Sequence, residues 1–217
     1  MEKLAIFDVD YTLTKRETFI ELYRFMLKKD IKLLFHFPNT LKTAFFYLFK
    51  IYDAGKAKEA FGRFLNGIHE EDLKNIVKEF YEKRLSKILY KDAIETIKKL
   101  KTEGYKIYLI SASPEIYLKE LYNIKEVDKI IGTKFRCQNG IYHSIIEGEN
   151  CKGEEKVKRL KEVLKNENME VDFKESYMFS DSLSDLPLFK LVGKPYLINY
   201  RGNPNKNKDN IEMLKWE

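Results

Sequence analysis

Apolar and polar residues follow two periodicities along this chain, and each periodicity predicts a different kind of secondary-structure element. Short runs rich in apolar, β-branched and aromatic residues predict buried strands at residues 3–9, 105–111, 129–135, 175–181 and 195–199. Apolar residues at helical spacing predict helices at 91–104, from Pro114 onward and at 153–166. Asn139-Gly140, between two alternating runs, predicts a β-hairpin. Strands that alternate with helices predict a parallel α/β sheet of the Rossmann-like kind, with right-handed crossovers.

The interval between the first and second strands breaks this alternation. Apolar residues recur there at helical spacing in three stretches, 17–29, 55–65 and 70–85. Between the first strand and Tyr105, no further strand is predicted. We therefore expect a small all-helical cap domain, residues 15–86, inserted after the first strand, with residues 1–14 and 87–217 forming the α/β core.

Polar side chains gather where the predicted strands end, and ligands bind at that edge of an open parallel sheet. They are Asp8 and Asp10 after the first strand, Ser111 at the end of the second, Asp181 and Asp185 after the fourth, and Lys152 and Lys156 at the start of the preceding helix. Because the carboxyl ends of parallel strands share one edge, we expect these side chains to converge on one pocket.

The chemistry of such a set is specific. Clustered carboxylates are stable only with a cation between them, and hard oxygen ligands suggest Mg²⁺. A lysine, a hydroxyl and backbone N–H groups suit a phosphoryl group, whose transfer depends mainly on positioning and charge neutralisation. An ionised aspartate can attack phosphorus to form an aspartyl-phosphate. A second aspartate two residues further on can protonate the leaving oxygen and then activate water.

Two other interpretations of the Asp8–Asp10 pair stand beside this one. The pair could be a solvated strand end without chemistry, although an apolar strand delivers both residues to a sheet end. It could also belong to a receiver-like regulatory domain that accepts a phosphoryl group. Receivers usually place two acidic residues next to each other and have no need of a helical insert. The DxD spacing and the insert therefore favour an enzyme.

The motifs, in their order, resemble those of the haloacid dehalogenase superfamily of phosphatases, in its phosphoserine-phosphatase-like branch with a small helical cap. The family's DxDxT motif corresponds to "DVDYT", residues 8–12. Its strand-ending serine corresponds to Ser111 in "YLISAS", its helix-opening lysine falls in "CKGEEKVKRL", and its Dx3D motif corresponds to "DSLSD" at 181–185. The resemblance covers essentially the whole chain, and it implies a HAD-like fold and phosphatase activity.

The resemblance also implies roles for the acidic residues. Asp8 would be the nucleophile and Asp10 the general acid and base. Asp8, the main-chain carbonyl of Asp10, and Asp181 would hold Mg²⁺. Asp185 would complete the acidic set around the metal.

The remaining site residues would bind the phosphate and the leaving group. Ser111, Ala112 beside it, and a lysine would face the phosphate. We assign this lysine to Lys156, which directly precedes the apolar-periodic part of its helix, whereas Lys152 lies in the loop before it. In the cap, Glu17 resembles the glutamate with which phosphoserine phosphatases contact the substrate amine. Arg63 could match their carboxylate-binding arginine, since a guanidinium suits a carboxylate.

Three positions depart from the phosphoserine phosphatase pattern. Ala112-Ser113 stands where glycines usually follow the strand-ending serine, and Ser182 stands where a glycine usually follows the fourth-motif aspartate. Tyr11 replaces the more common glycine inside the first motif. These departures leave the chemistry intact but make phosphoserine itself a less certain substrate.

The charge and cysteine content of the chain limit which partners and ligands are expected. The formal net charge is +6, and lysines are mixed with glutamates along the chain rather than gathered with aromatics into a basic stripe. Anionic partners fit this balance. A small phosphorylated substrate is therefore expected, and nucleic acid is not. Cys137 and Cys151 belong to no CxxC or Cys/His cluster, so structural zinc is not expected.

One apolar region bears on membranes. Residues 31–52 are rich in Phe and Leu but are interrupted by lysines, a histidine and a proline, so they are too polar to span a bilayer. With no room for a signal peptide before the first strand, we expect a cytoplasmic protein. As an alternative, residues 35–52 could approach a membrane surface and admit a phospholipid head group.

Overall fold

A computed structural model describes residues 1–32 and 53–217 of the chain. Its centre is a six-stranded sheet in the order β3-β2-β1-β6-β7-β8. Every strand pair in this sheet is parallel. The strands are β1 (Leu4–Phe7), β2 (Lys106–Pro114), β3 (Val127–Thr133), β6 (Tyr177–Ser180), β7 (Lys194–Ile198) and β8 (Glu212–Leu214). The predicted α/β fold class with a parallel core sheet is confirmed.

The strand order creates one topological switch point. From β1 the chain builds β2 and β3 on one side, then returns to the other side of β1 to build β6, β7 and β8. The connections on the two sides therefore diverge between β1 and β6, and a crevice opens there at the carboxyl ends of the strands. Asp8 directly follows β1 and Asp181 directly follows β6, so both lie at this crevice.

Alternate residues of β1 face two separate cores, because side chains in a strand point to opposite faces. Ala5 and Phe7 pack in one core with residues of α5 (Lys91–Thr102). Leu4 and Ile6 pack in the other core with residues of α7 (Glu154–Asn166). All four β1 residues are fully buried. Burial on both faces explains why this strand is continuously apolar until Asp8.

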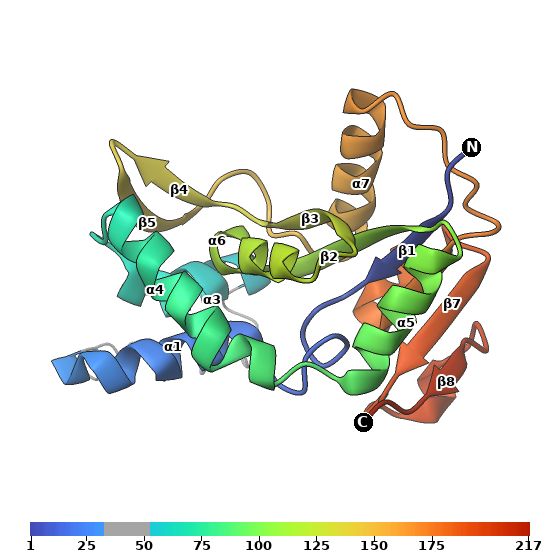
Figure 1. Cartoon of the computed structure of the whole chain (residues 1–217), viewed down its shortest axis with the longest axis horizontal. Helices are drawn as coiled ribbons and strands as arrows, with labels where there is room; N and C mark the ends of the chain where they lie inside the picture. The colour runs from blue at the N-terminus through green and yellow to red at the C-terminus, as the bar shows by residue number, and fades with distance from the viewer. Residues whose placement is uncertain (33–52) are drawn as a thin grey trace.

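The inserted segment forms helices in its described parts. These are α1 (Thr18–Lys29), α3 (Ala54–Phe61) and α4 (Glu70–Lys83), and in Figure 1 they lie together, away from β7 and β8. The helix predicted at 55–65 is divided between α3 and a 3₁₀ turn, Gly62–Leu65. Residues 35–52, the region with the alternative membrane-surface role, lie outside the described residues.

A β-hairpin from the core sequence joins these helices. Strands β4 (Phe135–Gln138) and β5 (Ile141–Ile146) are joined at Asn139-Gly140, both with positive φ, as the sequence predicts. The Gly67 N–H donates to the Tyr142 carbonyl at 3.0 Å, and the Tyr142 N–H donates to the Ile68 carbonyl at 2.9 Å. The cap side of the molecule therefore contains strands as well as helices (Figure 1).

Two elements differ from the sequence prediction. The helix predicted from Pro114 onward is one α-helical turn, α6 (Glu115–Leu118), followed by a 3₁₀ helix, Lys119–Asn123. Strand β8 was not predicted, because its three residues are too few to show an alternating pattern. It pairs with β7 and forms one edge of the sheet. Within the two described ranges, no helix is long and apolar enough to cross a membrane.

Candidate active site

A tight loop after β1 presents the two aspartates. The Asp8 N–H donates to the Phe179 carbonyl at 2.9 Å, which keeps the chain aligned with β6 beyond the end of β1. The Val9 carbonyl then accepts the N–H groups of Leu13 and Thr14, at 2.8 and 2.9 Å, and turns the chain back. Asp8 and Asp10 flank the start of this turn.

Tyr11 occupies the sharpest point of the loop. Its φ of 60° lies in the left-handed region, which favours glycine and is strained for a bulky side chain. The Tyr11 ring lines the site cavity, and the Arg201 guanidinium lies over it at 5.1 Å from the ring centroid. The cation–π contact helps to hold the ring against the cost of its backbone. This backbone conformation explains why glycine is more common at this position in the family that the motifs resemble. The tyrosine adds its ring to the cavity wall.

Thr12 connects the loop to the neighbouring strand end. Its side chain is fully buried, and its hydroxyl accepts the Asp181 N–H at 2.8 Å. The carboxylate of Asp181 is thereby held next to that of Asp8. The threonine of the DxDxT pattern thus has a structural reason, because it joins the two strands that flank the switch point.

Lys156 enters the same site from the first turn of α7. Gly153, with a φ of 58°, makes the turn that starts this helix. The Lys156 ammonium donates to Asp8 Oδ1 at 2.7 Å and to Asp185 Oδ2 at 2.8 Å, and its side chain is only 3% exposed. Burial alone would lower the pKa of Lys156, but the two carboxylates raise the pKa above its usual value. The lysine therefore carries a positive charge. The alternative, Lys152, lies exposed at the rim of the cavity.

One ammonium does not balance the negative charge of the site. Burial, together with the charges of Asp185 and Asp10, raises the pKa of Asp8 to about 8 despite the neighbouring Lys156. Burial and the same two carboxylates raise the pKa of Asp181 to about 6. Asp185 Oδ1 is buried and has no hydrogen-bond partner among the described residues. The negative charge of these carboxyl groups therefore exceeds the positive charge next to them.

This donor set fits a divalent cation. A cation bound by Asp8, Asp181 and the Asp10 main-chain carbonyl would offset the repulsion, and hard oxygen ligands suit Mg²⁺. No three His, Cys, Asp or Glu side chains in the described part of the chain form a ready-made metal cluster.

Ser111 lies near the carboxyl end of β2 and lines the same cavity as Asp8. Its side chain is buried, it lines the cavity, and its Oγ accepts the Ser113 N–H at 3.0 Å. Ala112, also in the cavity wall, presents its carbonyl to the Thr133 hydroxyl at 2.5 Å. The strand end is therefore fixed, and the Ser111 hydroxyl proton is free to be donated to an anion.

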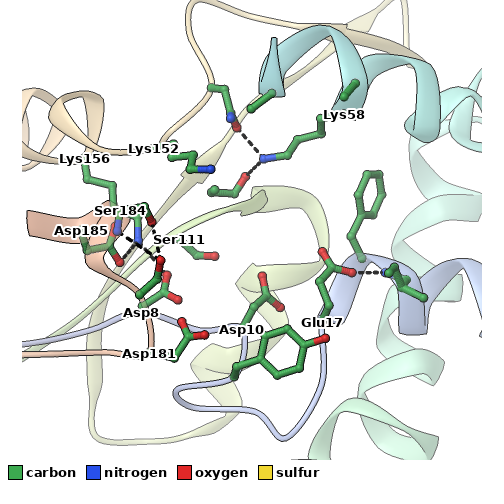
Figure 2. Close-up of a pocket in the computed structure, with 18 of the residues that line it drawn as sticks. Asp8, Asp10, Glu17, Lys58, Ser111, Lys152, Lys156, Asp181, Ser184 and Asp185 are labelled. Atoms are coloured by element: carbon green, nitrogen blue, oxygen red, sulfur yellow. Dashed lines mark hydrogen bonds and ion pairs between the residues drawn. The ribbon is translucent and has the colours of Figure 1, made fainter. Parts of the chain in front are cut away.

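A cavity of about 640 Å³ brings these residues together with the cap. Figure 2 shows Asp8, Asp181 and Asp185 near Lys156 at one end, with Asp10 and Glu17 further along. The described part of the cap contributes the charged residues Glu17 and Lys58 to the wall, and otherwise apolar residues: Phe19, Ile20, Ala54, Ala57 and Phe61. The cavity therefore has a charged end at the sheet edge and a more apolar end beneath the cap.

A model of the haloacid dehalogenase-like hydrolase family matches residues 5–190, which include all four motifs. The chain belongs to this family. It is 26% identical over 203 residues to protein CicA of Caulobacter vibrioides, covering 93% of this chain and 88% of that protein. It is 25% identical over 226 residues to a phosphoserine phosphatase of Methanocaldococcus jannaschii, covering 99% and 97%.

A solved structure supports the same fold assignment. A protein of unknown function from Bordetella pertussis Tohama I superposes with a TM-score of 0.85, at 20% identity, over 99% of this chain and 98% of that one. The family match confirms the resemblance drawn from the motifs, including the phosphoserine-phosphatase-like branch. The protein is therefore a phosphatase-type hydrolase, and the receiver interpretation is not supported.

Within this haloacid dehalogenase-like hydrolase, Glu17 lies in the cavity where the cap begins. Its Oε2 accepts the Ile20 N–H at 2.5 Å and so caps the first turn of α1. Burial and the charge of Asp10 raise the pKa of Glu17 to about 8. A cationic group on a bound molecule would stabilise its ionised form.

Arg63 is not brought to the cavity. Helix α3 ends at Phe61, and the following 3₁₀ turn exposes Arg63 on a different surface, in a pocket that includes Asp30 and Asp72. Among the described residues of the cap, the cation that lines the cavity is Lys58, on α3. Its ammonium donates to the Ala112 carbonyl and to the Asn150 side chain. Burial lowers the pKa of Lys58 to about 8.

Sequence reasoning missed Lys58 and Asn150. Lysine is abundant in this chain and recurs every few residues in the cap, so no local signal separates Lys58 from its solvated neighbours. Asn150 lies in the loop before α7, next to the lysine motif. Its nearness to that motif is the one signal that could have drawn attention to it.

Proposed function

We propose that this protein is a Mg²⁺-dependent phosphomonoesterase that works through an aspartyl-phosphate on Asp8. One observation carries the proposal. The Asp8 carboxylate lies at the switch point of the sheet, bonded at 2.7 Å to a buried lysine that also binds Asp185, with Ser111 lining the same cavity. This geometry holds a carboxylate in place to attack phosphorus and surrounds the phosphoryl oxygens with donors.

The reaction divides between the two aspartates of the first motif. An Asp8 oxygen forms a bond to phosphorus while the bond from phosphorus to the ester oxygen breaks, and that oxygen keeps the electron pair. Asp10 gives its proton to the leaving oxygen, which departs as an alcohol. Asp10 then takes a proton from water as the water oxygen attacks phosphorus. The bond to Asp8 breaks, and the products are inorganic phosphate and a free Asp8 carboxylate.

Other groups of the chain hold the phosphate during both steps. Lys156 neutralises charge on the phosphoryl oxygens, and Ser111 donates a hydrogen bond to them. Asp8, Asp181 and the main-chain carbonyl of Asp10 would hold Mg²⁺, which when bound adds positive charge beside the phosphoryl group. The cap wall excludes water from the leaving-group end of the cavity.

The leaving-group end suits a small molecule with charges of both signs. Glu17 can bind a cationic group, and Lys58 can bind an anionic group. The relative in Methanocaldococcus jannaschii is a phosphoserine phosphatase, and phosphoserine carries an amine and a carboxylate. We propose an amino-acid-like or similarly zwitterionic phosphate ester as the substrate class.

A panel of phosphate esters tests the activity and its metal requirement. Phosphoserine, phosphoethanolamine, glycerol 3-phosphate and p-nitrophenyl phosphate are assayed for phosphate release in Mg²⁺ and after chelation with EDTA. We expect turnover of at least one ester to fall by ~100-fold on chelation and to return with added Mg²⁺. Far-UV circular dichroism checks that the chelated protein stays folded. No turnover of any ester would refute the phosphatase proposal, and equal rates in EDTA would refute the metal requirement.

A pair of cap variants tests which cation recognises the substrate. Lys58→Met is expected to raise KM for phosphoserine by roughly tenfold, because a hydrogen bond to a charged group is lost. Its KM for p-nitrophenyl phosphate, which has no carboxylate, should change little. Arg63→Met is the matched control and should leave both KM values near those of the wild type. The opposite pattern, with Arg63→Met selective for phosphoserine, would show that Arg63 reaches the substrate.

A further inference from the structure

The Asp10 carboxyl group accepts hydrogen bonds from residues that do not line the cavity. Its Oδ1 accepts the Thr18 N–H and the Thr18 hydroxyl, both at 2.6 Å. Its Oδ2 accepts the Ser113 hydroxyl at 2.5 Å. Thr18 and Ser113 are both buried and are absent from the cavity wall, whereas Asp10 is part of it. Three donors from two segments thus fix both oxygens of one carboxyl group.

A third residue extends this network. The Tyr117 hydroxyl lies 2.9 Å from Thr18 Oγ1. Because the single hydroxyl proton of Thr18 is directed to Asp10, Tyr117 is the donor in this bond. Burial, with the charges of Asp10 and Glu17, raises the pKa of Tyr117 well above 10, so its proton is retained. Tyr117 therefore orients the Thr18 hydroxyl toward Asp10.

The two serines near the carboxyl end of β2 have different surroundings. The pairing of β2 with β3 is irregular between Ile110 and Pro114, the stretch that contains both serines. The DxD pair extends from β1, the strand next to β2. Ser111 lines the cavity with Asp8, whereas the Ser113 hydroxyl donates to Asp10. A glycine, which usually stands at this position in phosphoserine phosphatases, has no hydroxyl to offer.

We propose that Thr18, Ser113 and Tyr117 are positioning residues that fix the Asp10 carboxyl group for proton delivery to the leaving oxygen. This inference rests on the proposed phosphatase function. Thr18 is also the first residue of α1, the first helix of the cap. The orientation of the proton donor is thereby tied to the placement of the cap helix.

Substrates whose leaving groups differ in basicity test whether these residues assist proton delivery by Asp10. A p-nitrophenolate ion departs without being protonated, whereas an alkoxide must receive a proton as the P–O bond breaks. The readout is kcat/KM for p-nitrophenyl phosphate and for whichever of phosphoserine, phosphoethanolamine and glycerol 3-phosphate the wild type hydrolyses fastest. We expect Ser113→Ala and Thr18→Val to lose roughly 10- to 100-fold on the alkyl ester, because misplacing a catalytic group costs about this much. On p-nitrophenyl phosphate both variants should stay within about twofold of the wild type.

Three controls separate positioning from damage to the fold. Thr18→Ser keeps the hydroxyl and should recover most of the alkyl-ester activity. Tyr117→Phe should show a smaller but equally selective loss. Ser176→Ala removes another buried hydroxyl, one that donates to the Asp172 carbonyl at 2.6 Å and does not line the cavity, and should show no selectivity.

The outcomes are distinguishable. Equal losses on both esters in Ser113→Ala and Thr18→Val, or no loss on either, would overturn the positioning role and leave the phosphatase function standing. Wild-type turnover of p-nitrophenyl phosphate but of no alkyl ester would also overturn it, because Asp10 would then deliver no proton to an alkyl oxygen. An inactive wild type would overturn the proposed function and this inference together.

Discussion

Asp8→Asn is expected to lower kcat on every phosphate ester by roughly 10⁴- to 10⁶-fold, the scale seen when a nucleophile is removed. The amide matches the carboxylate in shape but cannot attack phosphorus. One oxygen remains to accept the Lys156 hydrogen bond, which is 2.7 Å long in the wild type. The fold should therefore survive while the covalent step is lost.

Acid quenching of the reaction tests directly whether the covalent aspartyl-phosphate forms. Wild-type protein mixed with a ³²P-labelled ester should retain label as an acid-stable, base-labile acyl phosphate, and Asp8→Asn should retain none. Asp128→Asn is the matched control, because Asp128 binds Lys101 and does not line the cavity. It should keep both label and turnover. An Asp8→Asn protein within tenfold of wild-type activity would contradict the mechanism.

Lys156→Met is expected to reduce kcat by about 10³-fold and also to destabilise the protein. The activity falls because a charge next to the phosphoryl group is removed, and such groups contribute this much to catalysis. The stability falls because Asp8 and Asp185 lose a cation bound at 2.7 and 2.8 Å inside the protein. Removing one partner of a buried ion pair costs about 3–5 kcal/mol of unfolding free energy.

A double variant separates the two effects of Lys156. Adding Asp185→Asn to Lys156→Met removes one of the unpaired buried charges and should recover part of the lost stability in urea unfolding. It should not recover activity. Lys152→Met, at the exposed rim, is expected to lose less activity than Lys156→Met. A larger loss in Lys152→Met would show that the phosphate-binding lysine had been assigned to the wrong residue.

Much of the core could be predicted because its signals are local. A strand buried on both faces must be apolar along its whole length, so β1 and β2 are visible in the sequence as short runs. Polar residues that interrupt such runs mark strand ends, and parallel strands bring those ends to one edge. The convergence of Asp8, Ser111 and Asp181 in one cavity follows from these two facts.

The cap could be predicted only as a set of helices. Apolar spacing shows which face of a helix is buried, but not where the helix docks on the rest of the protein. Arg63 and Lys58 lie five residues apart, and a change from α-helix to 3₁₀ turn between them decides which one enters the cavity. The hairpin that completes the cap comes from a later segment of the chain, since Gly67 and Ile68 of the cap bond to Tyr142.

By itself, the sequence determined the α/β core, the inserted helices and the identity of the strand-end aspartates, because periodicity and strand ends are properties of neighbouring residues. Only the tertiary structure decided which side chains meet across segments. It pairs Lys156 with Asp8, brings Lys58 rather than Arg63 into the cavity, and places Ser113 and Thr18 behind Asp10. These pairings depend on strand register and helix docking, which are set by packing between residues far apart in the chain.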